Sequence, residues 1–245
     1  MVTQPQLNEI IYPESDGKPM ADNTKQFRWI VVIEQNLEWL FADDPNVFVA
    51  GDLLWYPVEG NNRLCTAPDA MVVFGRPKGD RGSYLQWKEE NLPPQVVFEI
   101  LSPGNTPREM GRKLVFYNTY GVEEYYIYDP DRNQLEGWYR SEDGLLDQIE
   151  SIDGWISPRL GIRLQPGEEL QLYRPDGVPF FSFAQINQML DQERQRTEQE
   201  RQRAEEERRR AEESEQRAAE MERLLQQYRD AFGTLESDRF GELDP

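Results

Sequence analysis

A seven-residue repeat near the C-terminus divides the chain into two kinds of sequence. Written in sevens from Leu190, the chain reads LDQERQR, TEQERQR, AEEERRR, AEESEQR, AAEMERL. The repeat predicts a long helix, but only one position per heptad is even weakly apolar, so this helix cannot be part of a core. Ion pairs four residues apart, such as Glu206 with Arg210, would stabilise it by about 0.2–0.5 kcal/mol each. Residues 181–232 are therefore predicted as a charged helical tail, either solvated alone or in a weak coiled coil from Met221 onward.

The residues before the tail have the pattern of one α/β domain over 24–180. An extended leader is expected over residues 1–23, and a disordered end over residues 233–245. Asn23 or Thr24 can cap a first helix, whose apolar stripe is formed by Phe27, Ile30, Ile33, Leu37, Leu40 and Phe41.

Strands are predicted for VFVAGDLLWYPV, APDAMVVFG and PQVVFEIL, and then for VEEYYIYD, QLEGWYR and the segment around EELQLYR. A helix, PREMGRKLVFYNTYG, interrupts them, with Pro107 in its first turn and Gly121 at its C-cap. This order of elements predicts a mixed sheet flanked by helices.

Composition excludes several kinds of chemistry. The chain has no histidine and one cysteine, Cys65, so catalytic triads, His-ligated zinc and Cys-rich metal sites cannot be built within it. Carboxylates remain, and they suit a hard cation. The sequence shows no secretory signal and no long apolar run, so a cytoplasmic protein without a membrane partner is expected.

The acidity of the chain belongs to its globular part. The net charge is -19, and residues 191–223, with twelve acids and nine bases, account for only -3 of it, leaving -16 for the rest. Such a charge opposes broad electrostatic binding of nucleic acid.

Three acids occupy apolar surroundings. Glu99 lies inside a strand that reads as covered on both faces, and Asp69 opens another strand, on the face of Met71 and Val73. Glu34 falls within the apolar stripe of the first helix by helical arithmetic. Each could be a peripheral acid that is capped or paired, or the three could together ligate a divalent cation. Asp52, in VAGDLLWY, is an alternative third ligand.

Several ordered motifs carry a family resemblance. The succession APD at 67–69, VVFEILSPGN at 96–105, EMGRKLVFY at 109–117 and YGVEEYYIYDP at 120–130 resembles the Uma-two family of "putative restriction endonucleases", within the PD-(D/E)XK nuclease superfamily. The resemblance spans roughly residues 24–175. It implies a restriction-endonuclease-like core and a nuclease that cuts phosphodiester bonds, endonucleolytically on DNA, with Mg²⁺ or Mn²⁺.

The resemblance also implies roles for particular residues. Asp69 and Glu99 match the motif acids that hold the metal, and Glu34 resembles the first-helix acid of many superfamily members. The superfamily lysine should lie two residues after the glutamate, where this chain has Leu101; Lys113, on the following helix, is the expected substitute. Taken without the resemblance, Lys113 reads as an exposed helical lysine in a Glu–Lys pair with Glu109.

A basic loop offers a contact surface for the nucleic acid. Arg76, Lys78, Arg81 and Lys88 lie between the two acidic motifs, with Tyr84 and Trp87 available for stacking on bases. The alternative is an ordinary solvated loop.

Two alternatives concern the protein as a whole. Leu101 and the acidic surface favour a non-catalytic binding or assembly module, whose charged tail recruits a partner or oligomerises. A homo-oligomer could also form through the globular domain.

Overall fold

The computed structural model describes residues 10–232, which divide into two compact units with their boundary between Ala184 and Gln185. The expectation of a disordered end at 233–245 lies outside the described residues, as do residues 1–9 of the expected leader. No helix within the described range combines the length and apolar character that crossing a membrane requires.

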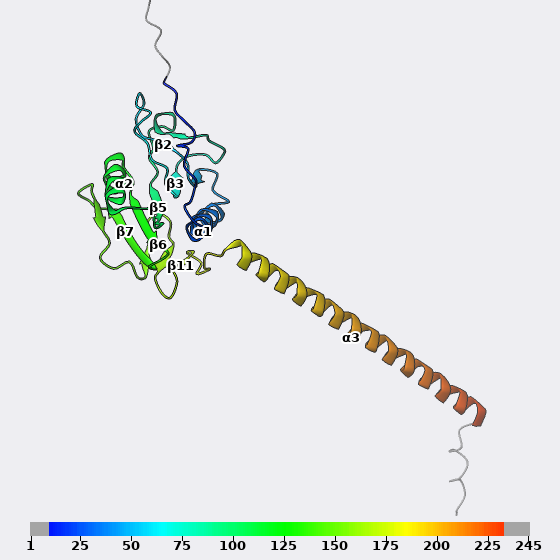
Figure 1. Cartoon of the computed structure of the whole chain (residues 1–245). Coiled ribbons are helices and arrows are strands. Elements are labelled where there is room, and N and C mark those ends of the chain that lie inside the picture. Colours follow the sequence, from blue (N-terminus) through cyan, green and yellow to red (C-terminus); the bar gives the residue numbers. More distant parts are fainter. Residues whose placement is uncertain (1–9, 233–245) are drawn as a thin grey trace, which may run out of the picture. The chain divides into compact units, whose positions relative to one another are not determined.

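A six-stranded mixed sheet forms the centre of the first unit, as the sequence predicts (Figure 1). Its order is β1-β3-β5-β6-β7-β8, and only the neighbours β5 and β6 are parallel. The strands are β1 Val47–Ala50, β3 Ala70–Phe74, β5 Val96–Ile100, β6 Glu124–Asp129, β7 Gln134–Arg140 and β8 Leu146–Gln148.

Smaller elements complete the unit. The strands β2 Trp55–Tyr56 and β4 Tyr84–Leu85 form a parallel pair, and η1 Gln86–Lys88 follows β4. The strands β9 Trp155–Ile156, β10 Arg163–Gln165 and β11 Gln171–Tyr173 form a three-stranded antiparallel sheet.

Two helices cover opposite faces of the central sheet (Figure 1). Helix α1, Thr24–Leu40, is capped by the Asn23 side chain, which accepts hydrogen bonds from two backbone N–H groups of the first turn. Helix α2, Pro107–Tyr120, begins after the capping Thr106 and ends at Gly121, whose φ of 92° is the left-handed conformation that glycine adopts readily. Because α2 connects the parallel strands β5 and β6, it must cross one face of the sheet, and its apolar residues join the core cluster on the face opposite α1.

The buried stripe of α1 differs from the predicted one. Phe27 is 48% exposed, whereas Trp29, Gln26 and Asn36 are buried. The two amides are buried because they have partners: Gln26 donates to the Ile100 carbonyl at 2.8 Å, and Asn36 exchanges hydrogen bonds with the backbone of residue 181. The stripe is therefore rotated toward Trp29, away from Phe27.

Residues 10–23 form neither helix nor strand, yet they pack against the domain. The Tyr12 ring lies 4.8 Å from that of Trp87 and 5.2 Å from that of Tyr56, and the Pro13 carbonyl accepts from the Tyr56 hydroxyl at 2.8 Å. This part of the segment is thus ordered by contacts distant in sequence.

Helix α3 spans Phe183–Phe232, and from Gln185 onward it forms the second unit within the described residues. Ion pairs connect Arg208 with Glu212 and Arg210 with Glu206 along the helix, the latter as predicted. Met221 and Leu225 are exposed. The coiled coil stays a prediction.

Candidate active site

Glu99 is the centre of the site. All five residues of β5 are buried, and Glu99 is 2% exposed, so its carboxylate must find partners within the protein. Two come from α2: the Lys113 ammonium lies 2.6 Å from Oε2, and the Tyr117 hydroxyl donates to Oε1. Lys113 and Tyr117 are four residues apart, and this spacing places both on the helix face that covers β5.

Asp69 lies beside Glu99, one residue before the neighbouring strand β3. The recorded antiparallel register pairs Ala70 with Phe98, and one further step places Asp69 opposite Glu99. The Ile100 N–H donates to Asp69 Oδ2 at 2.5 Å. Burial raises the pKa of Asp69 well above its ordinary value, and the negative charge of Glu99 adds to this effect. The two acids predicted from separate motifs are therefore adjacent.

The charge of Lys113 interacts with both acids. Burial lowers its pKa, but the charges of Glu99 and Asp69 outweigh burial, so the net shift is upward and Lys113 carries its positive charge. The residue at the expected lysine position, Leu101, packs against the apolar cluster between the sheet and α2. The helix thus supplies an ammonium group that the strand lacks.

Glu34 and Asp52 differ in their relation to this pair. Glu34 belongs to α1, and a Cβ added at Gly51 would lie 3.3 Å from both the Glu34 Cγ and the Asp69 carbonyl oxygen, so Glu34 lies near the backbone of Asp69. Gln35 donates to the Glu34 carboxylate at 2.6 Å. Asp52 is exposed in a left-handed conformation with φ of 49°.

Although Asp52 is exposed, surrounding protein atoms partly exclude water from its carboxylate, which raises its pKa; Asp16 raises the pKa further, Lys113 lowers it, and Glu99 adds a smaller upward shift. Asp52 therefore belongs to the electrostatic surroundings of the site. Within residues 10–232, no three acidic side chains converge closely enough to form a metal cluster.

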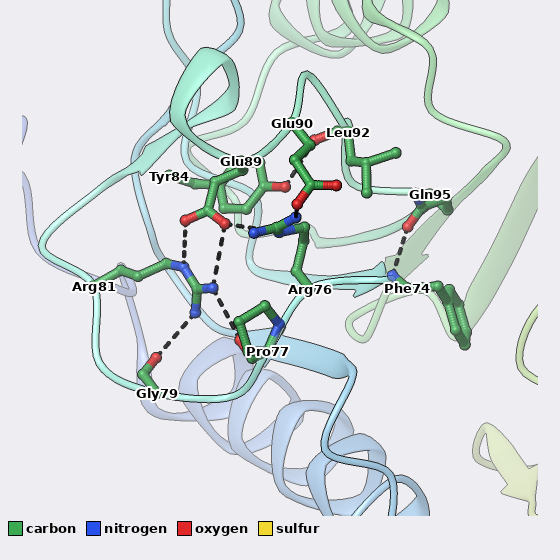
Figure 2. A network of polar contacts seen from close by, with 10 residues as sticks. All are labelled: Phe74, Arg76, Pro77, Gly79, Arg81, Tyr84, Glu89, Glu90, Leu92 and Gln95. Carbon is green, nitrogen blue, oxygen red and sulfur yellow. Dashed lines mark hydrogen bonds and ion pairs between the residues drawn. The ribbon is translucent and has the colours of Figure 1, made fainter.

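The predicted contact loop forms an ion-pair network of its own (Figure 2). Glu89 accepts from Arg76 at 3.0 Å and from Arg81 at 2.8 Å, and Arg76 also pairs with Glu90 at 2.7 Å. Burial raises the pKa of Glu89, but the two guanidinium groups overcome that effect and hold it below its ordinary value. Arg81 further donates to two carbonyls of the loop and stacks over the ring of Phe48.

Of the remaining loop residues, most are held by contacts within the protein and one is exposed. Lys78 pairs with Glu38 on α1 at 2.9 Å, whereas Lys88 is exposed. Tyr84 is fully buried and donates to the Leu92 carbonyl at 2.7 Å, so it cannot stack on a base. Trp87 is half-buried against Tyr12. In the structure, most residues of the predicted contact loop therefore make contacts that stabilise the loop itself.

Two tyrosines near Glu99 were not predicted as functional. The signal for Tyr117 is its spacing, four residues beyond Lys113 on the same helix face. Tyr125 is the neighbour of Val97 in the β5–β6 register, on the face of Glu99, and its buried hydroxyl has no hydrogen-bond partner among the described residues. Only the strand pairing could have shown that Tyr125 borders the site.

A mixed sheet whose adjoining strands carry facing acids, covered by a helix that brings a lysine to them, has the arrangement of a restriction-endonuclease-like nuclease domain. The model of the Uma2 (Uma-two) family, described as "Putative restriction endonuclease", matches residues 18–179, and the chain belongs to this family. The structural comparison includes a crystal structure of "a putative nuclease belonging to DUF820" from Anabaena variabilis, 15% identical, with a TM-score of 0.42, covering 58% of this chain and 74% of that one. No curated protein matches the chain.

Proposed function

We propose that the protein is a divalent-metal-dependent endonuclease that hydrolyses phosphodiester bonds of DNA. Asp69 and Glu99 hold Mg²⁺ or Mn²⁺, and Lys113 acts beside them. The observation that carries the proposal is the 2.6 Å contact between Lys113 Nζ and Glu99 Oε2, made by a lysine from the covering helix next to a second acid, the half-buried Asp69. A solvated helical lysine would not contact a carboxylate that is only 2% exposed.

The donor set fits a hard cation. Two adjacent carboxylates share one ammonium group, so the site holds an excess of negative charge, which is the reason the pKa of Asp69 is raised beyond the effect of burial alone. Mg²⁺ is commonly held by one or two carboxylates, with waters in its remaining positions, so a third acid is not needed. Both candidates for an outer acid border the pair: the charge of Asp52 interacts with those of Lys113 and Glu99, and Glu34 lies near the backbone of Asp69.

Each residue has a distinct part in the proposed reaction. When bound, the metal ion supplies Lewis acidity toward the scissile phosphate and toward a water. Lys113 stabilises negative charge that develops on the phosphoryl oxygens. Tyr117 is buried and cannot itself reach a polymer substrate, so its part is to fix the orientation of Glu99 through its hydrogen bond.

Binding of the polymer is proposed to involve the exposed edge of the basic loop. Lys88 is fully available and Lys78 is partly so, whereas the guanidinium groups of Arg76 and Arg81 are shared with Glu89. Their contribution is mainly to hold the loop in position. Because the net charge of the chain is -19, affinity for DNA should be modest and fall with salt.

The test is cleavage of supercoiled plasmid, single-stranded DNA and RNA in Mg²⁺ and in Mn²⁺ by the wild-type protein and by Glu99→Gln. A matched control is Glu124→Gln, since Glu124 is also a deeply buried glutamate, 2% exposed, and it bonds Tyr126 and Ser157 instead of the site residues. Calorimetric titration with Mn²⁺ gives a second readout that does not depend on turnover.

Loss of cleavage and of Mn²⁺ binding in Glu99→Gln, with both kept in Glu124→Gln, would support the proposal. Equal cleavage by wild type and Glu99→Gln would identify a contaminant and refute it. If the folded wild-type protein cleaves none of the three polymers, the result would instead favour the non-catalytic binding module.

A further inference from the structure

A hollow of about 710 Å³ lies between the N-terminal half of α2 and the strands β6 and β7. Its apolar lining comes from Met110 and Leu114 on the helix and from Ile127 and Trp138 on the sheet. Its polar lining includes Asp129 and Glu136, which share the sheet face of Ile127 and Trp138. Its volume is in the range of sites that take a nucleotide-sized ligand.

The hollow adjoins the candidate active site. Leu101, which lines it, follows Glu99 by two residues on the same strand face, and Gly111 and Leu114 flank Lys113 on the helix. Ring contacts connect the two on the sheet side. The Trp138 ring stacks on that of Tyr125 at 5.3 Å, and Tyr125 lies 4.8 Å from Tyr117, the partner of Glu99. A polymer whose phosphate reached Lys113 would therefore have a neighbouring nucleotide at the hollow.

Gly111 borders the hollow on the helix side. It lies in the interior of α2, where glycine is unfavourable for a helix, and a Cβ added there would meet no atom within 4 Å. No packing constraint on the protein's own side chains requires glycine at this position. Close approach of a ligand to the helix backbone would require it.

The charges of the hollow select the part of a nucleotide that can enter. Asp129 is 3.7 Å from Arg132, and Asp131 is 3.0 Å from Lys25. Glu136 is exposed and has neither a hydrogen bond nor an ion pair recorded within the described part of the chain. Carboxylates repel a phosphate, but they accept hydrogen bonds from the exocyclic amino group of a base.

We propose that this hollow binds a single nucleobase of the nucleic acid, from a nucleotide next to the cleaved bond, and that Glu136 accepts a hydrogen bond from its exocyclic amino group. The inference rests on the proposed function for the position of the polymer. The apolar lining of Trp138 and Met110 receives the flat face of the base. A base can enter only when it is unstacked from its neighbours, so single-stranded or locally opened substrates bind best.

Base preference is the direct test. The affinity of the full chain for fluorescein-labelled dC12, dA12 and dT12 is measured by anisotropy at low salt in EDTA, which prevents cleavage, with rC12 included to compare DNA and RNA. Cytosine and adenine have exocyclic amino groups and thymine has none, so dC12 and dA12 are expected to bind about tenfold more tightly than dT12. In Glu136→Gln, whose amide is neutral and can also donate, the difference is expected to shrink to threefold or less.

A blocking variant separates occupancy from folding. Leucine is a better helix former than glycine, so Gly111→Leu is expected to raise the thermal midpoint while filling the hollow and removing the preference for dC12 and dA12. Val115→Leu is the matched control, because Val115 is on the same helix, 66% exposed and outside the lining. It is expected to bind like the wild type.

The outcomes distinguish this inference from the proposed function. Binding without base preference, no binding of any oligonucleotide, or an unchanged preference in Gly111→Leu would overturn the hollow as a base site, whatever the plasmid assay shows. A base preference that depends on Glu136 and Gly111, in a protein that cuts nothing, would support the base site while refuting the nuclease.

Discussion

Removing the ammonium group of Lys113 should destabilise the domain by about 3 kcal/mol at pH 7.5. Loss of one partner from a buried ion pair costs about 3–5 kcal/mol, because the other charge stays buried without compensation. The lower end applies here for two reasons: the Lys113 side chain is 20% exposed, and Tyr117 continues to donate to Glu99 in Lys113→Met. With an m value of about 2 kcal/mol per molar in urea, the unfolding midpoint should fall by about 1.5 M.

Tryptophan fluorescence in urea measures this loss in the intact chain. The chain has six tryptophans, and all of them precede the boundary after Ala184, so the signal reports on the first unit and not on α3. The tryptophans are Trp29, Trp39, Trp55, Trp87, Trp138 and Trp155.

A double-mutant cycle identifies the cause. If the penalty arises from the unpaired carboxylate, Lys113→Met combined with Glu99→Gln should be more stable at pH 7.5 than Lys113→Met alone, with a coupling energy of about 2 kcal/mol. A loss below 1 kcal/mol in Lys113→Met, or additive effects in the double variant, would show that the ion pair is solvated and would refute the reasoning.

Other residues give further predictions. Burial and a neighbouring carboxylate raise the pKa of Asp69, so the contribution of Asp69 to stability is full below its ordinary pKa of 3.8 and is lost as the pH rises. The free energy of unfolding of Asp69→Asn, measured in urea, should therefore equal that of the wild type near pH 4 and exceed it at pH 8. Tyr125→Phe removes a buried hydroxyl without a recorded partner and should be neutral or slightly stabilising, whereas Tyr126→Phe loses its bond to a buried carboxylate and should cost about 1.5–3 kcal/mol; equal losses would contradict the structure. Glu89→Gln should lower the thermal midpoint by several degrees, since each kcal/mol lost corresponds to about 2–4 °C. It should not weaken DNA binding, because it frees the Arg81 guanidinium group from its ion pair. Weaker binding would mean that the network itself contacts DNA.

Much of the site is encoded locally. The apolar run around Glu99 predicts a buried carboxylate because burial of a strand on both faces is visible in its composition, and alternation predicts the face of Asp69. The spacing of Lys113 and Tyr117 predicts that they share a helix face. The caps at Asn23 and Gly121 depend on neighbouring residues, so the helix boundaries could be predicted as well.

Contacts between distant segments were beyond the sequence. The approach of α1 to Gly51 determines that Glu34 lies near the backbone of Asp69, and the chain path before β3 determines that the charge of Asp52 interacts with those of Glu99 and Lys113. The charge pattern could show that Arg76 and Arg81 are basic, but not that Glu89 is their partner.

The strand order decided the rest. Periodicity gives the face of each side chain relative to its own strand or helix, so the sequence by itself determined the elements and the acids that each must accommodate. It does not give the neighbour of that strand. The pairing of β3, β5 and β6 placed Asp69 and Tyr125 on either side of Glu99, and the crossover of α2 delivered Lys113 and left the hollow beside Gly111. Only the tertiary structure could decide these contacts, because each joins segments whose sequences specify nothing about one another.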